Sequence, residues 1–271
     1  MPLTDFVRYL NAQHPVFFAG DELSPAFVME DGKVLARYAG LSLSSIFHPI
    51  DDVREESLWG HVAGLAVTRL KTGVPVNEDV LFSMPNSDQE FVYLDRLVRT
   101  LHSLNYLTYR NWRQRGTLLL TVHPRHVASV ASDHGLAFEG ILKSCGLMPA
   151  QVALSFSLNA ADNRKHFVKA FENYRGRGYG IVLEQTDPSV IDRRLLEAIG
   201  PEIVVLPPDS RWSEDNVDEL HLCGARVMAG GNDSSAQRAL ASRIGIDLYQ
   251  RRPRQHKLIH GDVQHSLANP Y

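Results

Sequence analysis

The chain reads LLLTV at residues 118–122, VALSF at 152–156, IVL at 181–183, IVVL at 203–206 and VMA at 227–229. Short apolar runs that turn residues bound are typical of strands buried on both faces of a parallel sheet. The last run is followed by Gly230-Gly231, which we interpret as a tight turn rather than a phosphate-binding loop.

Helical patterns separate these runs. In residues 161–175, Phe167 and Phe171 recur at helical spacing. The segments 213–222 and 234–244 each begin with a serine suited to cap a helix N-terminus. Strand and helix therefore alternate, which predicts repeated βαβ units in a (β/α) barrel or a doubly wound sheet.

The first half is less regular. Residues 91–107 predict a helix with one apolar face. Residues 27–39 predict a hairpin that turns at 30–32, and 47–50 and 61–70 are candidate strands.

Length and composition fit one globular domain. The chain has 271 residues, close to the roughly 250 of a single (β/α) barrel. Its hydrophobic fraction of 44% and charged fraction of 22% are ordinary. We expect a single domain over residues 1–271, with 1–46 as an N-terminal segment and 252–271 as a C-terminal tail.

Charge and cysteine content limit the partners and the compartment. A net charge of −3 gives no general attraction to nucleic acid or to acidic lipid, so we expect neither as a partner. The two cysteines, Cys145 and Cys223, make no disulfide framework. Residues 1–20 lack a signal-peptide pattern, and no run reaches the ~18 apolar residues of a membrane span. These features predict a cytoplasmic protein.

In a (β/α) barrel, functional residues lie where the strands end. The predicted strand ends carry Thr121 and His123, Ser155 and Ser157, Glu184 and Gln185, Val205 and Pro207, and Gly230 and Asp233. Only Glu184 and Asp233 are acidic. A two-metal hydrolase needs several converging carboxylates, so this pattern argues against one.

Motif-like segments occur in a fixed order between residues 47 and 250. They are FHPI (47–50), GLAV (64–67), LDR (94–96), LTVHPR (120–125), GLMP (146–149) with LSFS (154–157), GYGIVLEQ (178–185), PEIVVL (201–206), GARVMAGGND (224–233) and GIDLYQ (245–250). In order and spacing they resemble F-Q-P-I, G-x-E-A-L, L-D-R, V-N-L-S-P-R, G-L-P-P with L-E-I-T-E, G-V-R-L-A-L-D-D, P-D-Y-L-K-I-D, G-L-R-V-V-A-E-G-V-E and G-C-D-L-V-Q of the EAL family of cyclic-di-GMP phosphodiesterases. The resemblance implies an α/β fold, an EAL-type (β/α)8 TIM-like barrel with one antiparallel strand.

The resemblance also implies a catalytic set, and most of its positions hold other residues here. The signature glutamate, a metal ligand, becomes Ala66, and the general-base glutamate becomes Gly230. The other counterparts are Thr121 for the asparagine ligand, Ser155 for the glutamate of E-I-T-E, Glu184 and Gln185 for the paired aspartates, Val205 for the lysine, Pro207 for the aspartate of K-I-D and Asp233 for the later glutamate. We therefore expect no catalytic residue, no bound metal and no cofactor.

The preferred interpretation is a catalytically inactive EAL-like regulatory protein that acts through protein–protein interaction in bacterial signalling. The segment 106–115 is a candidate patch with Tyr109, Trp112 and Arg113, because Tyr, Trp and Arg are typical of interface hot spots. Its alternative is a capped helix end and a loop. A homodimer is a further expectation, since EAL domains commonly pair through the segment after the D-D motif, here residues 186–194.

Two other functions stay open. A non-hydrolysing cyclic-di-GMP receptor is less favoured, because metals and the lysine also help to hold the ligand in the family. Its contacts would be Arg69, Arg125, Glu184, Asp233 and Gln250. An enzyme of another class on the same barrel is the second alternative.

A histidine metal site at His123 and His126, or at His256 and His260, lacks an evident third ligand.

Overall fold

Eight strands close into a barrel in the computed structural model, which describes residues 3–13, 25–108, 116–157, 164–184, 193–206, 213–231 and 235–251. Each strand pairs with the next in the order β3-β11-β10-β9-β8-β7-β6-β4, and β3 pairs again with β4. Their bounds are β3 Leu41–Asp52, β4 Ser57–Arg69, β6 Thr117–Thr121, β7 Val152–Ser157, β8 Gly180–Glu184, β9 Ile203–Leu206, β10 Arg226–Gly231 and β11 Leu248–Arg251.

One strand of the barrel runs against the others. β3 is antiparallel to both β4 and β11, whereas the remaining neighbours are parallel. The (β/α) barrel with one antiparallel strand is therefore confirmed.

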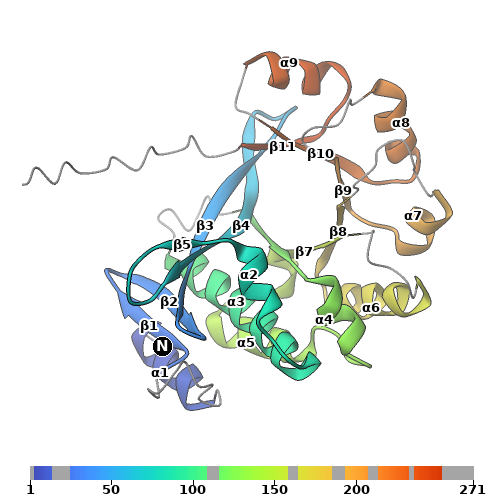
Figure 1. Ribbon diagram of the computed structural model, residues 1–271. Helices are drawn as coiled ribbons and strands as arrows, with labels where there is room; N and C mark the ends of the chain where they lie inside the picture. The colour runs from blue at the N-terminus through green and yellow to red at the C-terminus, as the bar shows by residue number, and fades with distance from the viewer. Residues whose placement is uncertain are drawn as a thin grey trace, which may run out of the picture.

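Helices surround the barrel (Figure 1). Their bounds are α3 Asp88–Thr108, α4 Pro124–Ser129, α5 Leu136–Cys145, α6 Arg164–Gly176, α7 Arg193–Ile199, α8 Glu214–Leu222 and α9 Ser235–Arg243, with a 3₁₀ turn at Pro149–Gln151. The predicted cap at Ser213 is confirmed, because its side chain accepts a hydrogen bond from the Asn216 N–H. None of the helices in the described part of the chain combines the length and apolar character needed to cross a membrane.

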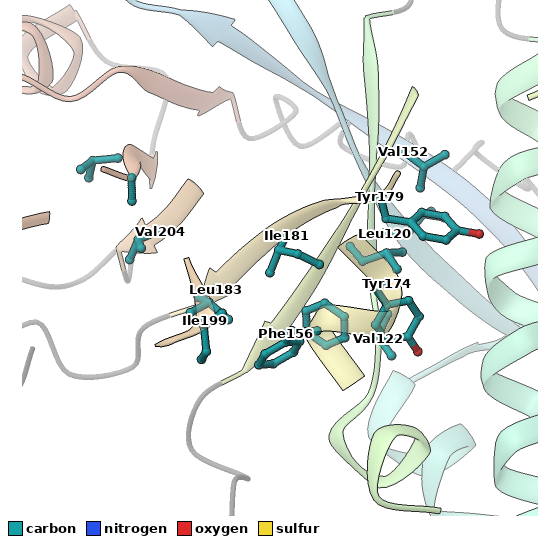
Figure 2. Packing of buried hydrophobic residues seen from close by; sticks show 14 of the residues in the cluster. Leu120, Val122, Val152, Phe156, Tyr174, Tyr179, Ile181, Leu183, Ile199 and Val204 are labelled. Carbon is teal, nitrogen blue, oxygen red and sulfur yellow. The ribbon is translucent and has the colours of Figure 1, made fainter. Parts of the chain in front are cut away.

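Apolar side chains fill both faces of the parallel strands. Inward-facing residues from seven barrel strands form one buried cluster, made of Ile50, Leu119, Ala153, Val182, Ile203, Met228 and Leu248. Outward-facing residues such as Leu120, Phe156 and Ile181 pack against the helices (Figure 2). Burial on both faces explains why these strands are continuous apolar runs in the sequence.

The predicted turn at Gly230-Gly231 is wrong, because β10 continues through both glycines. Gly230 pairs with Gln250 and Gly231 with Arg251 of the parallel strand β11. Strand pairing within the barrel outweighs the conformational freedom that makes glycine a turn residue.

The N-terminal elements widen the sheet on one side of the barrel (Figure 1). α1 spans Leu3–Gln13, β1 Phe27–Glu30 and β2 Lys33–Tyr38, while β5, Pro75–Val76, and α2, Glu78–Ser83, follow β4. The predicted hairpin is confirmed, with Asp31 at φ 48° and Gly32 at φ 75° in its turn. α1, β1, β2 and α3 share a second core with the outer parts of β3 and β4, which includes Phe6, Phe27, Leu43, Val67 and Leu97.

The buried amide of Asn105 closes the gap where β2 leaves β3. The Val34 N–H donates to Asn105 Oδ1 at 2.9 Å, and Asn105 Nδ2 donates to the Val34 carbonyl at 2.8 Å. The β2–β3 pairing covers only residues 36–38 and 41–43. Asn105 therefore replaces a strand neighbour and links α3 to the N-terminal sheet.

Candidate functional site

The carboxyl ends of the parallel strands present a ring of inward-facing side chains. Side chains alternate along a strand, so the residue two positions after an interior residue faces the same way. Counting from the interior cluster toward the strand ends gives Thr121, Ser155, Glu184, Val205, Gly230 and Gln250. We call this set the mouth ring.

Strand register brings members of the mouth ring side by side. Thr121 is the Cα partner of Ser155, Glu184 of Val205, and Gly230 of Gln250. The predicted strand-end positions therefore do converge at one end of the barrel.

Glu184 is the carboxylate of the mouth ring, and a buried serine holds it. The Ser155 hydroxyl is fully buried and donates to Glu184 Oε1 at 2.7 Å. A hydroxyl bonded to a carboxylate is a short, charge-assisted hydrogen bond that fixes the acceptor. In the described ranges, no group of three or more His, Cys, Asp and Glu is placed to hold a metal ion.

Glycine and glutamine meet on the adjacent strands β10 and β11 of the ring. A Cβ built on Gly230 would lie 3.4 Å from Gln250 Oε1, so the amide covers the space above the glycine. Gln250 also pairs through its backbone with Ile50 of the antiparallel strand. A glutamate at position 230 would have to displace this amide.

His48 adds an imidazole that the sequence interpretation assigned to no site. It lies two residues before the interior residue Ile50 on β3, so both side chains face the same way. Its Nδ1 is buried without a hydrogen-bond partner among the described residues. A Cβ on Gly64 would lie 2.8 Å from His48 Nε2. Burial lowers the pKa of His48, which favours the neutral ring. The glycine on the neighbouring strand was the available signal, but its register with β3 was unknown.

Arg69 and Arg125, two of the predicted ligand contacts, do not face the mouth ring. Arg69 is exposed at the end of β4, opposite Leu41 and on the face that Val67 shares with the second core. Arg125 donates from Nε to Asp88 Oδ1 at 3.1 Å, with its guanidinium carbon 4.7 Å from the centre of the Phe91 ring.

Several other predicted residues fall outside the described ranges. These are Asp233, Tyr109, Trp112, Arg113, Gln185 and Pro207, together with His256 and His260. Tyr106, at the start of the predicted patch, is buried, and its hydroxyl contacts His61 Nδ1 at 3.3 Å. That residue therefore belongs to the core rather than to an exposed patch.

A buried ion pair fixes the loop between β6 and α4 beside the mouth ring. Asp95 Oδ2 accepts from Arg99 Nε at 3.0 Å and Nη2 at 2.6 Å, and Asp95 Oδ1 accepts from the His123 N–H at 3.2 Å. Burial alone would raise the pKa of Asp95, but the Arg99 guanidinium holds it below its ordinary value.

His126 joins this network as a neutral ring. Its Nδ1 lies 3.1 Å from Asp95 Oδ2. Burial lowers the pKa of His126 to about 3, in spite of the neighbouring carboxylate. His126, one of the histidines considered as metal ligands, is therefore buried and already in contact with Asp95 and Arg99.

Two surface hollows lie away from the mouth ring. A groove of about 780 Å³ runs between α6 and α7, with Lys165, Lys169 and Arg194 around the apolar Val168 and Leu195. The second, of about 670 Å³, lies between α9 and the ends of β3 and β11. In it, Arg251 Nε lies 2.8 Å from Asp51 Oδ2.

Comparison with known proteins identifies the fold. No family model and no curated protein matches the sequence. Three solved structures each match 77% of this chain. They are the EAL enzyme Bd1971 bound to cAMP and cyclic-di-GMP (TM-score 0.62, 13% identity, 60% of that chain), Klebsiella pneumoniae BlrP1 in a calcium and cyclic-di-GMP complex (0.63, 15%, 54%), and the phosphodiesterase PaMucR in a cyclic-di-GMP complex (0.63, 14%, 89%).

These likenesses establish an EAL-type barrel. The identities are low, so they define the fold and leave the activity of this chain open. The chain also spans less than two thirds of the length of Bd1971 and of BlrP1.

Proposed function

We propose that this chain is a catalytically inactive EAL-like regulatory module of cyclic-di-GMP signalling that works through protein contacts. The observation that carries the proposal is the composition of the mouth ring. Among its six members, Glu184 alone bears a carboxylate, and the Ser155 hydroxyl binds it.

Two-metal phosphodiester hydrolysis has requirements that this ring does not meet. Hard divalent cations need several oxygen ligands, and the charged transition state needs metals or an equivalent clamp. Val205 and Gly230 offer no side-chain ligand atom, and Thr121 and Ser155 offer neutral hydroxyls. Ala66 on β4, which the resemblance aligns with the signature glutamate, offers none either.

The regulatory part of the proposal rests on the scaffold and on one segment. Apolar side chains pack both faces of the barrel strands in the described residues, so the outer surface of the scaffold is kept although the ring has a single carboxylate. Tyr109, Trp112 and Arg113 are the proposed partner-binding residues. A pull-down that compares the chain with its Trp112→Ala/Arg113→Ala variant tests them, and identical partners for both would remove the patch from the proposal.

The experiment for inactivity is a turnover assay. The purified chain is incubated with cyclic-di-GMP and Mg²⁺ or Mn²⁺, with PaMucR as the positive control. We expect no linear or mononucleotide product above the enzyme-free blank. Product that scales with the concentration of this chain would refute the proposal.

A non-hydrolysing cyclic-di-GMP receptor is the second candidate. BlrP1 and PaMucR were solved in complex with cyclic-di-GMP, and the Gln250 amide and the half-buried His48 offer polar groups at the mouth. Calorimetry with and without Mg²⁺ tests this role. Binding that Gln250→Ala weakens, while the exposed control Gln89→Ala leaves it unchanged, would favour the receptor.

A further inference from the structure

Three buried hydrogen-bond donors cluster between the helices without a partner. Arg99 Nη1, the Tyr174 hydroxyl and the Tyr179 hydroxyl have no hydrogen-bond partner among the residues that the structure describes. All three residues are at most 1% exposed. A buried donor left unpaired is destabilising, so three neighbouring ones call for an explanation.

Contacts between the rings show that these residues are neighbours. The rings of Tyr174 and Tyr179 lie 6.0 Å apart, and the ring of Phe138 is 6.3 Å from Tyr179. The guanidinium carbon of Arg99 lies 4.8 Å from the Phe138 ring. Figure 2 shows both tyrosine hydroxyls on the same side of the neighbouring strands.

Gly135 leaves room for the rings of Tyr174 and Tyr179. A Cβ on Gly135 would lie 2.8 Å from Tyr174 Cδ1 and 3.3 Å from Tyr179 Cε2. Gly135 has φ 84°, so both its backbone and its lack of a side chain suit this position.

Three arginines and two acids influence these groups: Arg99, Arg96 and Arg177 against Asp95 and Glu139, which leaves one positive charge in excess. Asp95 receives Arg99 through Nε and Nη2, which leaves Nη1 directed away from the carboxylate. Arg96, on the same helix, is close enough to Arg99 and Tyr174 for their charges to influence its pKa. His126 is neutral at pH 7 because burial lowers its pKa to about 3.

We propose that Arg99, Tyr174 and Tyr179 form a buried site for a small monovalent anion of the halide class. An anion accepts from all three donors and offsets the local positive charge, whereas a water that accepts from them must still find acceptors for its own protons. The site lies among α3, which carries Arg99, α5 and α6, which carries Tyr174. It is outside the mouth ring and independent of the proposed regulatory function.

The test measures melting temperature at constant ionic strength while gluconate is exchanged for chloride or bromide. The full chain should gain stability saturably with either halide, because the ion binds only the folded state. In gluconate, Tyr179→Phe should match or exceed the parent chain, since an unpaired hydroxyl has been removed. In halide it should lose most of the increase.

Tyr106→Phe is the matched control. Its hydroxyl contacts His61 and the Gly116 carbonyl, away from the cluster. This variant should lose stability equally in both salts and keep the full halide response. An anomalous peak between the three donors in bromide-soaked crystals would support the site.

The proposal is overturned if the melting temperature of the parent chain does not depend on halide, or if Tyr179→Phe keeps the full response. A peak at the site without anomalous signal in bromide would show ordered water instead, and it would equally overturn the proposal.

Discussion

Loss of the Asp95 charge should destabilise the chain far more than loss of a comparable surface charge. Asp95 and Arg99 are an i,i+4 pair whose side chains are only 4% and 2% exposed. In Asp95→Asn the amide oxygen still accepts the His123 N–H, but the Arg99 guanidinium stays buried without its counter-charge. Removing one partner of a buried ion pair costs about 3–5 kcal/mol, and we expect this substitution near 3 kcal/mol.

Urea denaturation followed by circular dichroism measures this cost. The matched control is Glu197→Gln, which removes the acid of another i,i+4 pair, Arg193–Glu197, with both side chains 54% exposed. We expect no measurable shift in its midpoint, because water screens that pair. A cost below about 1 kcal/mol for Asp95→Asn, or equal shifts for both variants, would refute the reasoning.

Three further predictions follow from buried polar groups. His102 and His126 both have pKa values lowered to about 3 by burial, against 6.5 unfolded; their stabilising effect is therefore complete above pH 6.5 and lost as the pH falls, by about 2 kcal/mol each at pH 5. A flat denaturation midpoint between pH 7 and 5 would contradict this. Asn105→Leu leaves an N–H and a carbonyl of β2 unpaired, and should cost about 2–4 kcal/mol in urea denaturation; a neutral effect would show that water replaces the amide. Gly64→Ala meets the imidazole of His48 and should cost about 1–3 kcal/mol, which His48→Ala should largely restore.

The barrel was predictable because its signal is local and repeated. Five of the strands are continuous apolar runs, and burial on both faces is what makes them so. The turn assigned to Gly230-Gly231 failed because composition alone does not reveal a neighbouring strand. Only the pairing with β11 shows that both glycines continue the sheet.

The rest of the fold could not be predicted because it depends on contacts between residues far apart in the sequence. The β1–β2 hairpin has a local turn signal, but its attachment to α3 depends on Asn105, which reaches Val34 across 71 positions in the sequence. Asp95 and Arg99 show a helical spacing, although nothing in that spacing says that the pair is buried.

The candidate site was also predictable only in part. Thr121, Ser155 and Glu184 were found because strand ends converge in a barrel. Gln250 was found through the resemblance of residues 245–250 to G-C-D-L-V-Q. The inward direction of His48 required the register of an antiparallel strand, and the hydrogen bond from Ser155 to Glu184 required the offset between β7 and β8.

The central claim is that an EAL-type barrel persists here with a mouth ring unsuited to two-metal chemistry. Cyclic-di-GMP turnover in the presence of Mn²⁺ tests it most directly, with PaMucR assayed in parallel. The account predicts product from PaMucR and none above the blank from this chain at any enzyme concentration. Metal-dependent product that rises in proportion to this chain, and that Glu184→Gln abolishes, would contradict it.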